Sequence, residues 1–335
     1  TRALVDSLEE AVVLVPPIFL RLLQNFINAK RPFQYGVISG FKRLWDRTGE
    51  LPHPLDWDKA WSELIQFFER LIGEHEFWTE QAIKDQNRTS NRDWIPPIIA
   101  DFMKAGTQDD NKAYSSSLLT RSWKLLVILL EKLEWQNEPP QSDAMTQAIN
   151  SSRGKAIEAV FSYALRACRL GDRERQRRAD VWALMKPVFE DELTKCQNAN
   201  YEFSTLAGAY ITHLDYIDKD WLKAQIHKIF PNEFQSNFIC ALGGLAYANV
   251  TRPVYALLVE SGIIDRALRL QIDDRRVIER LVERIALAYL WDDEKLDSSR
   301  FAYIFEPGQI EAIEDAMVGF GVLEKSSYPM SRWNE

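Results

Sequence analysis

The stretch Ala148–Cys168, AINSSRGKAIEAVFSYALRAC, decides the fold class, because a polar cluster leads directly into a regular apolar repeat. Asn150, Ser151 and Ser152 have short side chains that can accept hydrogen bonds from the free amides of a helix's first turn. Apolar residues then recur at intervals of three and four, as on one face of a helix: Ile157, Val160, Phe161, Ala164, Leu165 and Cys168. The stretch therefore predicts a capped helix with one apolar face.

The Gly154-Lys155 pair in this stretch raises the alternative of a phosphate-binding loop. That loop needs the pattern G-x-x-x-x-G-K-[ST] after a strand, so that backbone amides, lysine and hydroxyl surround the phosphates. Here Ile149 replaces the first glycine, Ala156 replaces the hydroxyl residue, and no strand pattern precedes them. We therefore predict no nucleotide and no other cofactor at this stretch. Gly154 is instead expected to allow close backbone approach, with Arg153 bonded to the carbonyl end of another helix.

The same three- and four-residue spacing recurs along the rest of the chain, and alternating strand patterns are hard to find. The segment Trp57–Ile72, preceded by Asp56 as a cap, is one example among roughly fifteen expected helices. No fixed repeat period or recurring motif is present. We predict an all-α protein, an irregular HEAT-like α-solenoid of antiparallel helix pairs, with helical arrays over 1–140 and 141–335 that continue one another. The 11 tryptophans are expected to pack between helices rather than to form ligand cages.

Composition indicates an ordinary globular protein, with 335 residues, 46% hydrophobic and 27% charged. Three separate cysteines suit a reducing compartment and do not form a disulfide framework. The most apolar run is interrupted by Pro16-Pro17 and is too short to span a bilayer. Because the chain begins at Thr1 without a signal peptide, we expect a cytoplasmic protein and a segment of a longer polypeptide.

Patterns that would carry catalysis or bind metal are absent from the sequence. The four histidines His53, His75, His213 and His227 show no metal-ligand spacing, and no G-x-S-x-G turn occurs. Cys168 falls on an apolar stripe, where a cysteine is usually a small core residue. We expect no catalytic and no metal site in this chain. One alternative stays open: a hydrolase whose scattered carboxylates and histidines meet only in the fold.

The segment Ser151–Lys186 has a charge opposite to that of the whole chain. It holds nine basic and four acidic residues, a formal charge of +5, which leaves −13 for the rest of a chain whose total is −8. A basic surface of this kind could meet nucleic acid, an acidic protein face or an acidic neighbouring subunit. The alternative is a helix start in water with internal Arg/Glu pairs. The candidate binding residues are Asn150, Arg153, Lys155, Arg173, Arg175, Arg177 and Arg178.

Three stretches together resemble the helical C-terminal region of large bacterial proteins that carry a sirtuin-like domain at the N-terminus. They are AINSSRGKAIEAVFSYALRACR, DKDWLKAQIHKIFP and NFICALGGLAYANVTRPVYALLVESGIIDRAL, within Ala148–Leu268. Proteins of this family are associated with defence against bacteriophage. The resemblance implies that the sirtuin-like domain depletes NAD on infection, while the helical region detects a phage component or holds the assembly inactive.

This sequence itself contains no sirtuin fingerprint, neither a Gly-rich dinucleotide loop after a strand nor a catalytic histidine setting. The resemblance therefore implies a noncatalytic recognition and assembly region, with NAD consumption belonging to a linked or partner domain. Expected partners are proteins, a phage protein or the effector domain, in an assembly with other subunits and without a membrane. A nucleic-acid binding module using residues 153–186 is the alternative.

Overall fold

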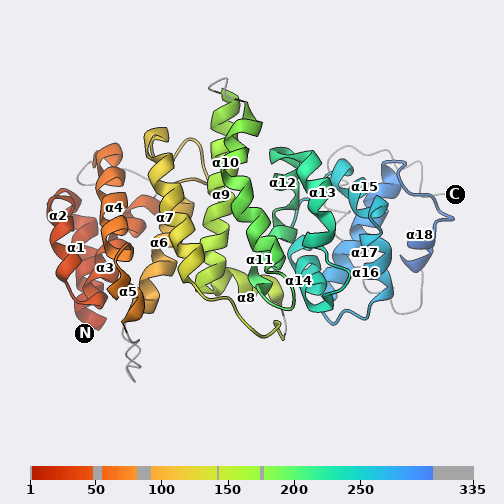
Figure 1. Ribbon diagram of the computed structural model, residues 1–335, viewed down its shortest axis with the longest axis horizontal. Coiled ribbons are helices and arrows are strands. Elements are labelled where there is room, and N and C mark those ends of the chain that lie inside the picture. Colours follow the sequence, from red (N-terminus) through yellow and green to blue (C-terminus); the bar gives the residue numbers. More distant parts are fainter. Residues whose placement is uncertain (1, 48–54, 81–91, 142, 174–176, 305–335) are drawn as a thin grey trace. The chain divides into compact units, whose positions relative to one another are not determined.

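A computed structural model describes residues 2–47, 55–80, 92–141, 143–173 and 177–304, which fold as helices joined by short connections. These residues form 18 α-helices and three 3-10 helices, and no strand occurs among them (Figure 1). The all-α prediction is thus confirmed. No helix in these described ranges is both long and apolar enough to cross a membrane.

The chain divides into two compact units, each with its own core. Unit 1 comprises Thr1–Gln136 and Thr146–Glu192, and unit 2 comprises Asn137–Met145 and Leu193–Glu335. The helical arrays expected over 1–140 and 141–335 differ from this division, since each unit takes residues from both sides of position 140. Two helices contain the points of division, α8 (Ala144–Asn150) and α10 (Arg178–Thr194).

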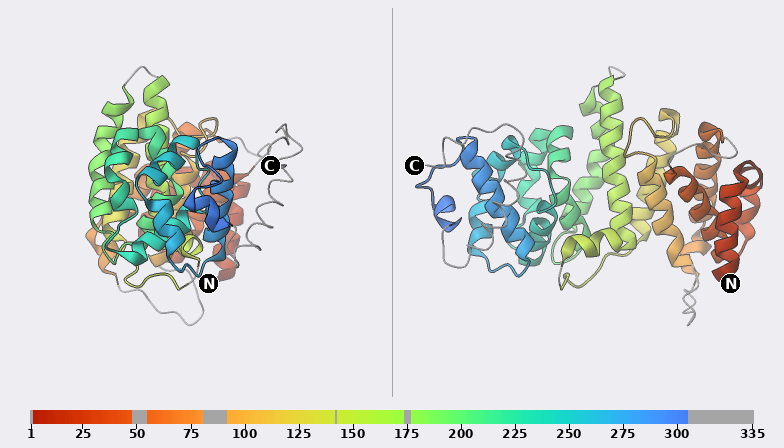
Figure 2. Two further views of the ribbon diagram at one scale, coloured as in Figure 1. Left: turned by 90° about the vertical axis from the view of Figure 1, so that its right-hand side faces the viewer. Right: turned by 180° about the vertical axis from the view of Figure 1, so that it is seen from behind.

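Unit 1 is built from helices that pack mainly on partners near them in sequence. α1 packs on α3, and both α6 and α7 pack on α9, as Figures 1 and 2 show from three sides. Besides α8 and α10, which contain the points of division, the elements of unit 1 are α1 (Arg2–Leu14), α2 (Pro16–Leu22), η1 (Leu23–Asn28), α3 (Arg31–Asp46), α4 (Trp57–Ile72), α5 (His75–Thr79), η2 (Arg92–Trp94), α6 (Ile95–Ala105), η3 (Ser116–Leu118), α7 (Leu119–Lys132) and α9 (Ser152–Arg173).

The prediction that the helix after Ser151 has one apolar face is wrong. In α9 the run Ala156–Ala164 is buried at every position, including Glu158 and Ser162, while Leu165 is partly exposed. The reason is that α6 and α7 both pack against α9, so that two sides are covered instead of one. α9 is therefore largely buried, and polar residues on it must find partners inside the protein.

The expectation that tryptophans pack between helices is met in part in unit 1, where Trp45, Trp61 and Trp182 are buried but Trp94 is 43% exposed. Trp61 is fully buried and its ring lies 5.2 Å from Trp45, 4.6 Å from Phe102 and 5.1 Å from Tyr114. The helix that carries it, α4, begins at Trp57, and the Asp56 side chain accepts a hydrogen bond from the Lys59 amide. The predicted cap and both predicted helix bounds are confirmed here.

Unit 2 is centred on the contact between α11 and α14, which run close together. A side chain on Gly244 would lie 1.7 Å from the Thr205 carbonyl oxygen, so only glycine allows this approach of the two backbones. α12 packs on α13 and α17 packs on α14. The helices are α11 (Tyr201–Ala209), α12 (Ile211–Ile217), α13 (Lys219–Ile229), α14 (Gln235–Leu245), α15 (Arg252–Glu260), α16 (Ile263–Arg269), α17 (Arg275–Leu290) and α18 (Ser299–Ile304).

Candidate functional site

The polar cluster before α9 is a helix cap at a tight corner between α8 and α9. The Ser151 hydroxyl accepts a hydrogen bond from the Gly154 amide (2.8 Å) and donates to the Ala148 carbonyl (3.1 Å). Asn150 is exposed, and its amide nitrogen donates to the Thr146 carbonyl at 2.8 Å. The predicted cap is therefore confirmed with Ser151 as the capping side chain, which satisfies one of the free amides of α9.

Gly154 sits at the closest point of this corner. A Cβ atom at this position would lie 1.8 Å from the Ala148 carbonyl oxygen and 2.6 Å from its carbon. The predicted close approach is confirmed, and the element that approaches is the last turn of α8. Glycine is required here because any side chain would collide with backbone atoms that cannot move aside without opening the corner.

Arg153 is buried in unit 1, with only 1% of its side chain exposed. Nη1 donates to the carbonyls of Leu130 (2.5 Å) and Leu133 (2.6 Å) at the end of α7, and Nη2 donates to the Glu192 carboxylate (2.5 Å). The guanidinium also lies 5.3 Å from the centre of the Trp135 ring. The predicted bond to the carbonyl end of another helix is confirmed. Arg153 thus holds α7, α9 and α10 residues together within unit 1, and its charge is not presented at the surface.

Other cations of the basic segment are paired with carboxylates within unit 1. Lys155 lies 2.5 Å from Asp101 on α6, and Arg169 holds both oxygens of Asp110 at 3.0 and 2.9 Å. Arg173 reaches the same carboxylate at 3.0 Å. The hydrogen bond from Arg169, assisted by the charges of the nearby arginines, lowers the pKa of Asp110 below its usual value. These pairs attach α9 to α6 and to the loop that follows it.

The last part of the basic segment is more exposed. Arg173 has 61% of its side chain exposed, Arg177 is exposed, and Arg178 lies 3.2 Å from Asp172. Arg175 lies outside the described residues. The candidate binding residues are therefore not one surface: Arg153 is buried, Lys155 is partly buried in an ion pair, and Arg173, Arg177 and Arg178 are accessible.

The sequence predicted for Arg153 alone a feature that recurs in the structure, an arginine that donates to backbone carbonyls at helix ends and in the loops beside them. Arg166 donates to the carbonyls of Gly106 and Tyr114, and burial lowers its pKa. Arg266 donates to the carbonyls of Pro231 (2.7 Å) and Asn232 (3.0 Å). Arg284 donates to the carbonyl of Leu245, at the end of α14. The available signal was an arginine within a run of apolar residues, such as Arg166 between Leu165 and Ala167.

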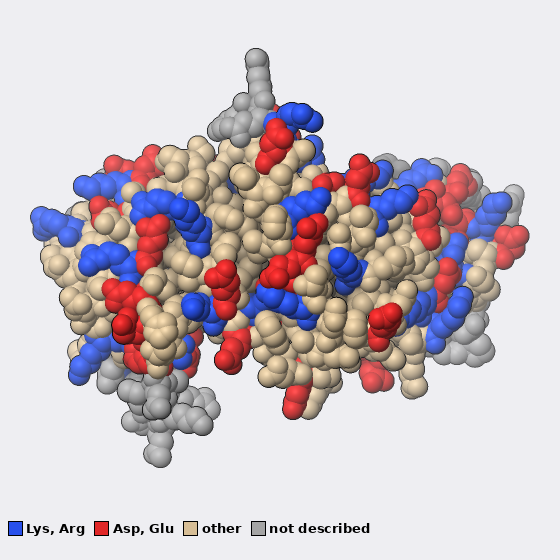
Figure 3. Space-filling model, in the orientation of Figure 1, with Lys and Arg blue, Asp and Glu red and all other residues tan. Residues whose placement is uncertain are grey.

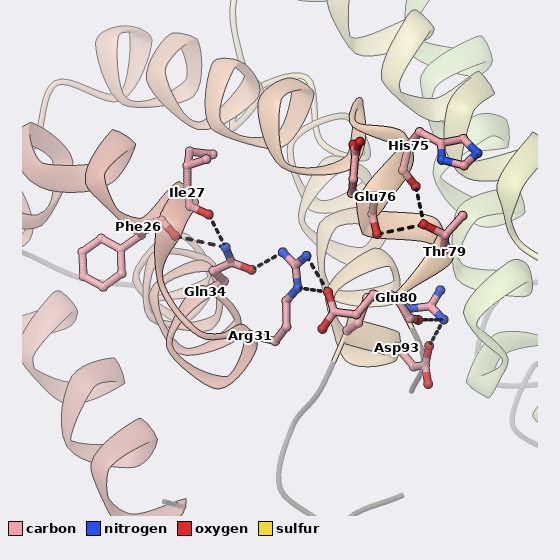
Figure 4. A network of polar contacts seen from close by, with 10 residues as sticks. Phe26, Ile27, Arg31, Gln34, His75, Glu76, Thr79, Glu80 and Asp93 are labelled. Carbon is pink, nitrogen blue, oxygen red and sulfur yellow. Dashed lines mark hydrogen bonds and ion pairs between the residues drawn. The ribbon is translucent and has the colours of Figure 1, made fainter. Parts of the chain in front are cut away.

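A polar network in unit 1 accounts for the residues around His75 (Figure 4). Buried Gln34 donates to the carbonyls of Phe26 (3.1 Å) and Ile27 (2.7 Å) and accepts from Arg31 (2.8 Å). Arg31 pairs with Glu80 at 2.6 Å. The exposed His75 takes part through its backbone carbonyl, and its ring points away from the network in Figure 4. These bonds connect η1, α3 and Glu80, the C-cap residue of α5.

The first two helices expose an unusual amount of apolar surface. Four of the nine large apolar side chains that are exposed in the described residues lie here: Leu4 (62%), Leu14 (60%), Ile18 (45%) and Leu22 (41%). Ile18 and Leu22 are four residues apart in α2 and share a face of that helix. Leu4 and Leu14 lie at opposite ends of α1, so we use the name α1–α2 apolar surface for Ile18 and Leu22 together with the neighbouring Leu14. A group of exposed apolar side chains in one place is typical of protein interaction sites.

Comparison with known proteins adds no assignment to these features. No protein-family model, no curated protein and no solved structure matches the chain. Within the residues that the structure describes, no group of three or more His, Cys, Asp and Glu side chains could hold a metal ion. Two accessible features thus remain as candidate recognition surfaces in unit 1, the α1–α2 apolar surface and the arginines 173, 177 and 178.

Proposed function

We propose that this chain is a noncatalytic recognition and assembly region that binds protein partners, within a bacterial antiphage defence protein. The observation that carries the binding of a protein is the α1–α2 apolar surface. Exposed leucine and isoleucine side chains gain free energy when a partner removes them from water, about 25 cal/mol per Å² of apolar area. The defence role rests on the resemblance of Ala148–Leu268 to the helical region of sirtuin-associated proteins.

The chemistry of this surface favours a protein partner with its own apolar face. Ile18 and Leu22 form a short row on one face of α2, and Leu14 is the last residue of α1, separated from α2 by the bend at Val15. An amphipathic helix or apolar loop of a partner can cover such a row with complementary side chains. Under the proposal, the partner is a phage protein or the NAD-depleting effector domain, and the helical packing of unit 1 gives the surface a rigid base.

The alternative of a nucleic-acid binding module receives less support from the geometry. Phosphate binding needs cations that can release their counterions and face the polyanion. Arg153 is already bonded to Glu192, Lys155 to Asp101, and Arg169 to Asp110. Among the candidate residues, Arg173, Arg177 and Arg178 are accessible to a phosphate, which is fewer than the nine basic residues of the segment.

The test is protection against phage by the natural polypeptide that contains this chain. Expression in a bacterial host should lower the plaque number for at least one phage of a panel. The variant Ile18→Glu/Leu22→Glu should abolish protection, because two carboxylates would have to be buried at the interface. Leu184→Glu is the matched control, since Leu184 is a leucine in α10 that is 77% exposed and lies outside the α1–α2 apolar surface.

Far-UV circular dichroism and melting temperature must show that all three proteins are equally folded. Full protection by Ile18→Glu/Leu22→Glu would contradict the role of the α1–α2 apolar surface. Absence of protection by the unaltered polypeptide across a broad panel would contradict the defence role. Cellular NAD, measured after infection, separates an NAD-depleting effector from other kinds.

A further inference from the structure

Unit 2 contains a pocket of about 570 Å³ that is lined by three arginines of one helix face. Arg276, Arg280 and Arg284 occur at intervals of four residues on α17 and therefore point to the same side. Residues 246–250, which follow α14, form the opposite wall. We call this feature the α17 arginine pocket. Its volume is within the range of sites that hold small molecules.

The three arginines differ in exposure, from the rim of the pocket to its interior. The side chains of Arg276 and Arg280 are about half exposed, whereas Arg284 is buried. Arg276 lies 3.6 Å from Asp143 and stacks on the Tyr247 ring at 4.8 Å, and Arg280 pairs with Glu283 at 2.5 Å. The ion pairs of Arg276 and Arg280 are thus exposed to water, which weakens them.

Arg284 has no carboxylate partner within the described part of the chain. Its Nη2 donates to the carbonyls of Leu245 and Ala248, at 2.5 and 3.1 Å, while Nε and Nη1 make no hydrogen bond to any described residue. Neither of these two nitrogens is among the buried polar atoms that lack a partner, and Arg284 is one of the residues that line the pocket. Burial lowers the pKa of Arg284 to about 10, and the side chain stays charged at neutral pH.

Comparison with Arg153 shows what Arg284 lacks. Both are buried arginines that bond the carbonyl end of a helix, but Arg153 also has the buried Glu192 carboxylate at 2.5 Å. A buried cation without a carboxylate at bonding distance costs free energy, because water solvation is lost and the Glu283 charge acts on Arg284 only from farther away. An anion in the pocket would give Arg284 a negative charge at bonding distance, as Glu192 does for Arg153.

We propose that the α17 arginine pocket binds a phosphate monoester of a small molecule, with Arg284 and Arg280 as its ligands and Arg276 at the rim. The lining holds three arginines against the single carboxylate of Glu283, which leaves a formal charge of +2. A phosphate monoester carries about −1.5 to −2 charges at pH 7 and offers several acceptor oxygens, whereas a single carboxylate carries one charge. Arginine forks bind phosphate oxygens in pairs.

Further groups of the lining fit the remainder of such a ligand. The backbone amides of Asn249 and Val250 make no backbone hydrogen bond within the residues described, so both are available as donors. Leu287 and Ala246 give the pocket an apolar part beside the arginines. A phosphate with a small organic group, such as a nucleoside monophosphate, would match both parts. This proposal is independent of the α1–α2 apolar surface and of any defence role.

The test is titration calorimetry and thermal melting of the purified full chain with inorganic phosphate, adenosine monophosphate and succinate at constant ionic strength. We expect saturable binding of the two phosphates, a higher melting temperature in their presence, and no such effect of succinate. Arg280→Gln should weaken phosphate binding at least about tenfold, since a charged hydrogen bond is lost. Arg275→Gln is the matched control, because Arg275 is adjacent on α17, pairs with Glu279 at 2.7 Å and does not line the pocket.

Arg284 needs a separate variant, because its loss also removes a bond to the end of α14. Arg284→Lys keeps the charge but not the fork, and we expect weaker phosphate binding with a nearly unchanged melting temperature of the unliganded chain. Sedimentation with phosphatidic acid vesicles separates a lipid phosphate monoester from a soluble one. The proposal is overturned if no phosphate binds saturably, if succinate binds equally well, or if Arg275→Gln and Arg280→Gln lose binding to the same extent.

Discussion

Individual arginines inside this protein donate hydrogen bonds to carbonyl groups at helix ends. A helix leaves its last four carbonyls without partners inside the helix, and burial makes that loss expensive. Arg153, Arg166 and Arg284 each donate to such carbonyls while their long side chains pass through apolar surroundings. An arginine suits this task because it has five donors in a rigid plane and two carbonyls can be reached at once.

Removal of Arg153 should destabilise the fold strongly. Arg153→Met takes away the bonds to Leu130 and Leu133 and removes the guanidinium that pairs with the buried Glu192 carboxylate. We expect a loss of about 3 to 5 kcal/mol in the free energy of unfolding, which urea denaturation followed by fluorescence would measure. The double variant Arg153→Met/Glu192→Leu should recover part of this loss, because the buried carboxylate that had paired with Arg153 is removed as well. A single variant as stable as the native chain would contradict this account of Arg153.

Gly154 should tolerate no side chain, not even a methyl group. The added Cβ of Gly154→Ala would lie 1.8 Å from the Ala148 carbonyl oxygen, so the corner between α8 and α9 must open. We expect a loss of about 1 to 3 kcal/mol or more, and a greater loss for Gly154→Leu, measured by thermal or urea unfolding. Gly243→Ala is the control: its Cβ would meet only the Ala144 Cβ, at 3.2 Å, and helix propensity favours alanine. Equal stability of Gly154→Leu and the native chain would rule out the close contact.

At the scale of elements, α9 is held by ion pairs along its length as well as by its apolar residues. Lys155 pairs with Asp101, Lys104 with Glu158, and Arg169 with Asp110, so that charges alternate between α9 and the α6 region. Such pairs are partly shielded from water and favour one register of α9 against α6. A shift of α9 by one turn would separate all of them at once.

The pair between Arg169 and Asp110 predicts a pH-dependent stability. Because the folded-state pKa of Asp110 is lowered, its contribution is present above the ordinary pKa of aspartate, about 3.9, and is lost as pH falls through the lower folded-state value. We expect Arg169→Gln to lose about 0.5 to 1 kcal/mol at pH 7, because the pair is partly exposed. This difference from the native chain should shrink below about pH 4, as urea midpoints at several pH values would show.

Lys42→Gln serves as the control for this pH dependence, since Lys42 pairs with Asp46 on the exposed side of α3. Its effect at pH 7 should be within about 0.5 kcal/mol. A difference between Arg169→Gln and the native chain that is constant from pH 7 to pH 3 would contradict a role for the Asp110 charge.

The sequence predicts the helices of this protein well because their apolar spacing and caps are local. The bounds Trp57–Ile72, the Asp56 cap, the Ser151 cap and the close contact at Gly154 all follow from neighbouring residues. The neighbours of a helix in space come from distant parts of the sequence. The sequence therefore did not reveal that both α6 and α7 cover α9. The charged partner of Arg153 and the carbonyl partners of Arg284 belong to elements far along the chain. Sequence could therefore suggest Arg153 as a donor to carbonyls but could not identify Glu192 or the α17 arginine pocket.

At the scale of the whole molecule, the balance of charges decides which polymers the chain can meet. The net charge is −8, and on the face drawn in Figure 3 the basic and acidic side chains are interspersed rather than gathered by sign. A polyanion is repelled by the total charge and gains little from cations that already have carboxylate partners. The folded segment 151–186 therefore offers fewer unpaired cations to a nucleic acid than its formal charge of +5 indicates.

This balance leads to an expectation for nucleic acid that can be measured directly. In fluorescence anisotropy with labelled single-stranded RNA and duplex DNA, we expect no binding tighter than about 100 μM at physiological salt, the weak end of non-specific affinity. The variant Asp101→Asn/Asp110→Asn should bind better at low salt, because it releases Lys155, Arg169 and Arg173 from their partners. Micromolar binding by the native chain that weakens steeply with salt, and is lost in Arg173→Gln/Arg177→Gln/Arg178→Gln, would reverse the argument and make the exposed arginines a nucleic-acid site.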